Sequence, residues 1–254
     1  PEHVVVRLDL RNAYNEIDRC VALRRLAAVP ELAHLAPLFH ALHAPMARLQ
    51  LSTGRGLFDG VADRAGDSEE GVRQGSAESS AVFCVGIAPE LAALDRELAA
   101  VGGVARGDAD DVYACGPPRV VFDAVARFAE SIERELGLVM RPEKLLCFSH
   151  NVDLFTCPER VAHGVPVGIL RDEAGEPLLV PCGPRGVARP VFGITVGGVP
   201  VGEEDFEMEW MARRGATVAG YITSTREQLR HLPGHLWGIL FYCLQSRLDY
   251  WLRL

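Results

Sequence analysis

Three clusters in the 254-residue chain combine residue types that can do chemistry. The first runs from Arg7 to Asn15 and places Asp9 at the end of an apolar, partly β-branched run over residues 4–10. Such a run predicts a buried strand, so Asp9 is expected at a sheet edge, facing a cleft, with Tyr14 opening the following helix. Taken alone, this cluster fits a helix-capping aspartate and a packed core tyrosine better than an active site.

The second cluster is Gly107 to Val112, in which Asp108, Asp110 and Asp111 crowd a tight turn between two apolar strands. Crowded like charges are unfavourable unless a cation neutralises them. Mg²⁺ prefers carboxylate oxygens, so the turn is a candidate metal site. A solvated acidic turn is the simpler alternative.

The third cluster, Gly71 to Ser76, frames Arg73 and Gln74 between two glycines ahead of a predicted helix. Glycines permit close backbone approach to a ligand, and a helix N-terminus favours phosphate. Glycine-rich turns before helices are common, so this cluster is weak by itself.

The helices and strands that must position these clusters are predicted from the spacing of apolar residues and from the residues that end or interrupt regular structure. We expect Asn12 or Asn15 to cap the first helix, Pro37 to break the second and Pro89 to restart the third. The predicted helices cover residues 16–28, 31–43, 81–100, 119–136, 203–231 and 235–254. The predicted strands and hairpins cover residues 4–10, 46–61, 112–115, 145–148 and 167–180. This order predicts an α+β fold with an antiparallel sheet.

Composition limits the function classes. With 26 basic and 34 acidic residues the formal net charge is −8, whereas nucleic-acid binders are usually basic. The seven cysteines form no C-x-x-C pair, which favours free thiols and an intracellular protein. No apolar run reaches the roughly 18 residues that span a membrane, so no membrane partner is expected. The strand at Val4 follows Pro1 almost at once, and we expect a piece of a longer protein.

In their order along the chain, these clusters resemble the palm of reverse transcriptases. Asp9 to Asn15 resembles the first palm motif, and Gly71 to Ser76 the motif that lines template and nucleotide. Asp108 to Asp111 resembles the (Tyr/Phe)-x-Asp-Asp hairpin. Gly137 to Lys144 matches the following Gly-Leu and Pro-x-Lys motif, and Val191 to Ile194 resembles the primer grip. The sequence from Asn12 to Asn15 and the spacings between the motifs resemble non-LTR retrotransposons more closely than retroviruses.

The resemblance implies an RNA-directed DNA polymerase that joins a dNTP to a DNA primer 3′-hydroxyl on an RNA template. It implies a palm over residues 1–202 and a helical thumb-like segment over residues 203–254, with the fingers missing. The acidic balance then follows from where the chain is cut, because the fingers and the rest of the thumb carry most of the basic contacts.

The resemblance also implies roles for single residues. Two Mg²⁺ ions, or Mn²⁺, would be held by Asp9, the Leu10 carbonyl, Asp110 and Asp111. Tyr14 would clash with a 2′-hydroxyl and so select deoxynucleotides. Gln74 and Gly75 would line the nucleotide and template, and Lys144 would act as general acid on the leaving pyrophosphate.

Departures from the family pattern define the alternatives. Asp108 stands where the family usually has Tyr or Phe, and only eight residues precede Asp9, so this chain alone is expected to be a poor polymerase. The leading alternative is a catalytically degenerate scaffold or a decayed retroelement copy. An RNA-templated RNA polymerase conflicts with Tyr14, and a nucleotide cyclase leaves Gln74 and Gly75 unexplained.

Overall fold

A computed structural model describes residues 2–43, 47–48, 67–68, 70–72, 77–172, 174–182 and 187–233. The chain forms two compact units, which are Pro1–Leu145 with Thr156–Val165, and Leu146–Phe155 with Pro166–Leu254. Helices and antiparallel strand pairs confirm the α+β class. The division into palm and thumb at residue 202 stays a prediction.

The sheet of the first unit has the strand order β4-β5-β1. Its strands are β1 (Val4–Asp9), β4 (Val104–Asp108) and β5 (Asp111–Gly116). Alternate residues of β1 are buried, namely Val4, Val6 and Leu8. This period of two leaves Asp9 on the opposite face, at the end of its strand, as the sequence predicts.

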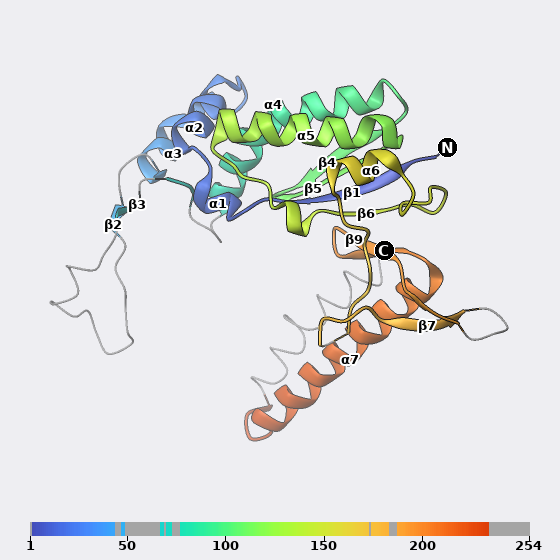
Figure 1. The fold of residues 1–254 in the computed structure, drawn as a ribbon. Coiled ribbons are helices and arrows are strands. Elements are labelled where there is room, and N and C mark those ends of the chain that lie inside the picture. The colour runs from blue at the N-terminus through green and yellow to red at the C-terminus, as the bar shows by residue number, and fades with distance from the viewer. Residues whose placement is uncertain are drawn as a thin grey trace. The chain divides into compact units, whose positions relative to one another are not determined.

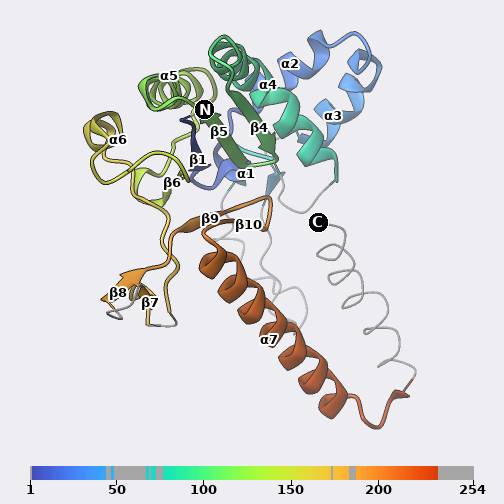
Figure 2. The same ribbon diagram turned by 90° about the vertical axis from the view of Figure 1, so that its right-hand side faces the viewer.

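Two long helices, α4 (Ala77–Ala99) and α5 (Pro118–Leu136), lie side by side over one face of this sheet (Figures 1 and 2). Gly137 ends α5 with a left-handed φ of 68°, which confirms the predicted helix stop. The predicted restart of α4 at Pro89 is wrong, because the helix continues through that proline. An internal proline costs about 3 kcal/mol, and buried side chains on both sides of it, such as Phe83 and Leu98, offset this cost.

The N-terminal helices differ from the prediction in where they begin. A single turn, α1 (Ala13–Glu16), precedes α2 (Arg19–Ala28), and Asp18 caps α2 by accepting from the Val21 amide. The predicted cap at Asn12 or Asn15 is therefore wrong. Asn12 instead adopts a left-handed φ of 44° and makes no side-chain cap bond, because the chain must turn sharply out of β1.

The remaining elements of the first unit are short. A 3-10 turn, η1 (Ala33–Leu35), leads into α3 (Ala36–His43), so the predicted helix over residues 31–43 is broken just before Pro37, which lies in the first turn of α3. The structure adds α6 (Pro158–His163), which packs against α5 and was not predicted. The other short elements are β2 (Ala47–Arg48), β3 (Asp67–Ser68) and η3 (Pro142–Lys144).

The second unit combines two hairpins with one long helix. Its elements are β6 (Leu146–Phe148), β7 (Leu179–Cys182), β8 (Val187–Pro190), β9 (Gly193–Val196), β10 (Val199–Gly202) and α7 (Glu204–Gln228). Its core includes Val191, Phe206 and Trp210. The predicted helix over residues 235–254 and the turn around residues 52–56 lie outside the described residues. No helix in the described part of the chain is long and apolar enough to span a membrane.

Close backbone approach at Gly103 generates a stability prediction. A Cβ there would lie 2.4 Å from the Cys115 carbonyl oxygen. This oxygen belongs to the backbone of the sheet, so moving it away would cost free energy. We expect Gly103→Ala to lower the free energy of unfolding by about 1–3 kcal/mol, measured by urea denaturation. The exposed substitution Ala100→Ser should change it by less than about 0.5 kcal/mol. Equal stability of the Gly103 variant would contradict this packing.

Candidate active site

Asp9 and Asp110, which are 101 positions apart in the sequence, line one cleft of about 210 Å³. The cleft is lined by Asp9, Leu10, Asn12, Ala13, Tyr14, Asn15, Asp110, Arg141 and Lys144. All of these belong to the first compact unit. The structure thus brings together five of the residues singled out from the sequence, namely Asp9, Leu10, Tyr14, Asp110 and Lys144.

The β4–β5 hairpin sets the position of Asp110. Asp108 pairs directly with Asp111, so the turn consists of Ala109 and Asp110 alone. Ala109 adopts a left-handed φ of 55°, a conformation that costs a non-glycine residue about 1 kcal/mol. The turn is tighter than the predicted turn from Gly107 to Asp111. Gly107 lies within β4, where a Cβ would come within 2.9 Å of the Leu91 side chain of α4.

Asp111 lies on the sheet beside the cleft and not among the cleft-lining residues. In the β1–β5 register it stands opposite Asp9, and one carboxylate oxygen is 3.8 Å from Arg7 Nη2. Partial burial raises the pKa of Asp111, Arg7 opposes that shift, and the neighbouring charges of Asp110, Asp9 and Asp108 add to it. The carboxylates of this hairpin are therefore close enough to repel one another.

Asp9 faces two cations from the segment after α5. Its Oδ2 atom lies 3.6 Å from Lys144 Nζ and 3.8 Å from Arg141 Nε. The backbone holds this segment in place, because the Arg141 amide donates to the Asp9 carbonyl at 2.9 Å and the Arg11 amide to Val139 at 2.8 Å. These two bonds flank the bridge between Leu10 and Met140, so neither uses the Leu10 carbonyl.

Tyr14 is fixed from the side of α4. Its ring stacks on the buried Phe83 ring at 4.8 Å between centroids, and its hydroxyl donates to Ser80 Oγ at 3.1 Å. The Tyr14 carbonyl accepts from the Val72 amide. The ring therefore forms a preorganised wall of the cleft.

Gln74 and Gly75 lie outside the described residues, so their predicted role stays a prediction. The start of their cluster is described. Gly71 has a φ of 72°, and a Cβ there would lie 2.3 Å from the Asn15 carbonyl oxygen. This first glycine is therefore required by packing against the chain itself.

Four cleft-lining residues received no site role from the sequence, namely Asn12, Ala13, Asn15 and Arg141. Arg141 directly precedes the Pro-x-Lys motif, and the available signal is a second cation three residues before Lys144. Only the tertiary fold shows that both cations approach the same oxygen of Asp9.

The cleft offers the oxygen atoms of two carboxylates, those of Asp9 and Asp110. Among the described residues no group of three or more His, Cys, Asp or Glu side chains could hold a metal ion. Mg²⁺ is commonly bound through one or two carboxylates together with substrate phosphates and water. Asp9 and Asp110 supply two carboxylates at one cleft, which matches that mode of binding and not an all-protein cage.

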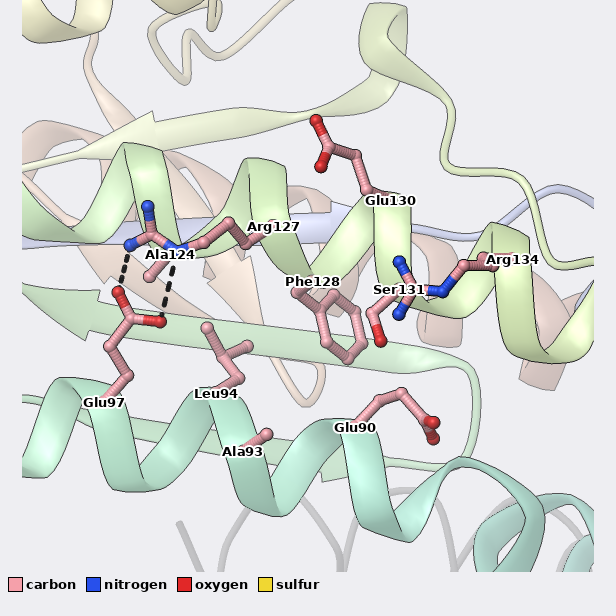
Figure 3. Close-up of a pocket in the computed structure, with 10 residues that line it drawn as sticks. All are labelled: Glu90, Ala93, Leu94, Glu97, Ala124, Arg127, Phe128, Glu130, Ser131 and Arg134. Atoms are coloured by element: carbon pink, nitrogen blue, oxygen red, sulfur yellow. Dashed lines mark hydrogen bonds and ion pairs between the residues drawn. The ribbon is translucent and has the colours of Figure 1, made fainter.

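A second cavity, of about 380 Å³, lies between α4 and α5 (Figure 3). Its apolar lining includes Leu94 and Phe128. Most charged groups at its rim are paired, since Arg127 bonds to Glu97, Arg25 holds Glu90 and Arg134 bonds to Glu135. It offers no cluster of reactive groups, unlike the cleft at Asp9.

Comparisons with known proteins leave the family open. No family model matches the chain, and no curated protein matches it either. Among solved structures, the chain is similar to telomerase from Candida albicans in complex with the TWJ fragment of telomeric RNA, with a TM-score of 0.44 and 13% identity over 60% of this chain and 27% of that one. It is also similar to apo telomerase from Candida tropicalis truncated from the C-terminal domain, with a TM-score of 0.44 and 13% identity over 60% of this chain and 32% of that one. The chain thus spans about a third or less of either telomerase. Its function must be argued from the cleft itself.

The raised pKa of Asp111 predicts a pH dependence. A carboxyl group that binds its proton more tightly in the folded state stabilises that state at acid pH, and this contribution is lost as pH rises through the raised pKa. We expect Asp111→Asn to raise the melting temperature at pH 7, with the gain shrinking as pH falls through the raised pKa and disappearing below about pH 4. The ion pair with Arg7 that is lost is partly exposed and contributes little.

Asp95 provides a control of opposite sign. The Ala105 amide and Arg106 lower its pKa, so its contribution is present at neutral pH and is lost as pH falls below about 4. Asp95→Asn should therefore lower the melting temperature at pH 7. A lower melting temperature for both variants at pH 7 would refute the crowding of carboxylates around Asp111.

Proposed function

We propose that this chain carries the catalytic palm of a retroelement RNA-directed DNA polymerase, which adds a dNTP to a DNA primer on an RNA template. The observation that supports this most is the meeting of Asp9 and Asp110 in one cleft with the Tyr14 ring and Lys144. Carboxylates, a flat aromatic wall and a cation are the parts that nucleotidyl transfer needs.

The carboxylates supply the negative part of the site. Asp9 and Asp110 would hold Mg²⁺ with the Leu10 carbonyl as a further oxygen ligand. Metal held by these residues would supply charge stabilisation for the attacking and leaving oxygens of the transfer. Asp111, turned toward Arg7, would act through its charge and not as a direct ligand.

Lys144 supplies a proton. Its ammonium group is half exposed and 3.6 Å from Asp9, so it borders the space that the triphosphate would occupy. From that position it would donate its proton to the leaving pyrophosphate oxygen and act as the general acid.

Tyr14 would discriminate between deoxyribose and ribose in the incoming nucleotide. Phe83 and Ser80 hold the ring in place, so it cannot move aside cheaply for a larger sugar. A 2′-hydroxyl on the incoming nucleotide would collide with this ring.

The second candidate is a degenerate scaffold that keeps the palm without its activity. The ion pairs favour it, because Asp9 is engaged by Lys144 and Arg141 and Asp111 by Arg7. In such a scaffold these cations would permanently occupy the place of the metal.

The first test removes the carboxylate at the hairpin turn. In the full-length protein, Asp110→Asn should reduce primer extension on an RNA template on the order of 10²–10³-fold, measured with Mg²⁺ and with Mn²⁺. The control Asp123→Asn removes an exposed carboxylate on α5, and its rate should stay within about twofold of the unsubstituted rate. Undiminished extension by the Asp110 variant would reject the assignment. Absence of extension and of Mn²⁺ binding in the unsubstituted chain would favour the scaffold.

The second test concerns the sugar. Tyr14→Ala should raise ribonucleotide incorporation relative to deoxynucleotide incorporation by about tenfold or more, since a steric clash is removed. Tyr14→Phe keeps the ring and loses only the hydrogen bond to Ser80, so its selectivity should stay nearly unchanged. Competition between dNTP and rNTP measures both variants, and equal selectivity for all three proteins would remove this role.

A further inference from the structure

The two carboxylates of the cleft differ in their charge partners. Asp9 Oδ2 lies within 3.8 Å of both Arg141 and Lys144. Asp110 makes no ion pair within the described part of the chain. The Asp9 and Arg141 side chains are only 23% and 28% exposed, so solvent screens their attraction incompletely.

Arg141 is held near Asp9 by the backbone and not only by charge. Its amide donates to the Asp9 carbonyl, and the 3-10 turn that follows carries Lys144 back to the same oxygen. Two cations are thus fixed beside Asp9 before any ligand arrives. A divalent cation that approaches Asp9 must compete with both of them.

A polyphosphate would remove the competition of Arg141 and Lys144 for Asp9. It brings several negative charges, and guanidinium and ammonium groups are strong phosphate partners. When phosphate oxygens pair with Arg141 and Lys144, the Asp9 carboxylate becomes available to bind a divalent cation.

We propose that Arg141 and Lys144 form an exchangeable cation pair, which occupies Asp9 in the free protein and passes to the polyphosphate of the incoming nucleotide when metal binds. The proposal rests on the proposed function, which it deepens by assigning Arg141 as a polyphosphate-binding residue. Metal and polyphosphate then favour each other's binding, because each removes the partner that opposes the other.

Opposite effects of one substitution on two ligands test the exchange. Arg141→Gln should tighten Mn²⁺ binding in the absence of phosphate by about three- to tenfold, measured by electron paramagnetic resonance of the free ion. The same variant should weaken tripolyphosphate binding in EDTA by a similar factor, measured by calorimetry. Separate measurements avoid chelation of the metal by the phosphate.

Matched variants separate the exchange from general effects. Arg141→Lys keeps the charge and should leave both affinities within about twofold. Arg11→Gln removes a nearby cation that pairs with Glu16 and not with Asp9, and should also change both little. Asp110→Asn should weaken Mn²⁺ binding if the ion lies in the cleft. Melting temperatures confirm that each variant folds.

Three outcomes for Arg141→Gln would overturn the proposal. Weaker binding of both Mn²⁺ and tripolyphosphate would indicate a structural role for Arg141. Unchanged binding of both ligands, or an unchanged affinity for tripolyphosphate alone, would also overturn it. If the unsubstituted chain binds no Mn²⁺, the double variant Arg141→Gln/Lys144→Gln must reveal binding, and its failure to do so also overturns the exchange. Opposite effects on the two ligands without any primer extension would support the exchange and reject the polymerase.

Discussion

The register between β1 and β5 is the constraint on which the site depends, because it sets Asp9 directly opposite Asp111. Like charges in such positions destabilise a sheet. The register is nevertheless fixed, since a slip by one residue would turn Leu8 and Val112 from the core to the other face. The hydrophobic core under α4 and α5 thus holds the carboxylates together, and the hairpin from β4 adds Asp108 opposite Asp111.

The repulsion between the carboxylates of Asp9 and Asp111 is reduced by basic side chains in two different ways. Arg7 lies on the same face of β1 as Asp9 and pairs with Asp111, and neither Arg7 nor Asp111 lines the cleft. Arg141 and Lys144 reach Asp9 from a separate segment at the cleft. Only the second arrangement leaves cations beside a space where a ligand can meet them. The same ion pairs can therefore belong to a resting polymerase or to a scaffold, and their ability to exchange distinguishes the two.

How far the sequence predicts this structure depends on how local each signal is. The strand that ends at Asp9 and the helix that stops at Gly137 follow from short patterns, and both are confirmed. The start of α2 at Asp18 and the uninterrupted α4 do not follow from short patterns, because distant contacts support them. The Asp18 amide donates to the Leu136 carbonyl, and Phe83 and Leu98 of α4 are buried. The approach of Arg141 to Asp9 depends on a backbone bridge between segments about 130 residues apart, which periodicity cannot show.

The glycine-rich cluster shows why a motif residue needs a structural test before it counts as part of a site. Gly71 resembles a residue that admits a ligand, yet the space beside it is filled by the Asn15 backbone. The buried Arg19 guanidinium donates to the carbonyls of Gly71, Glu70 and His43, which holds this segment against the chain that carries Tyr14. The positive φ and the missing Cβ at Gly71 therefore serve the wall of the cleft. Any contact of this cluster with a nucleotide must come from residues after Val72, because the glycine before it is already committed to packing.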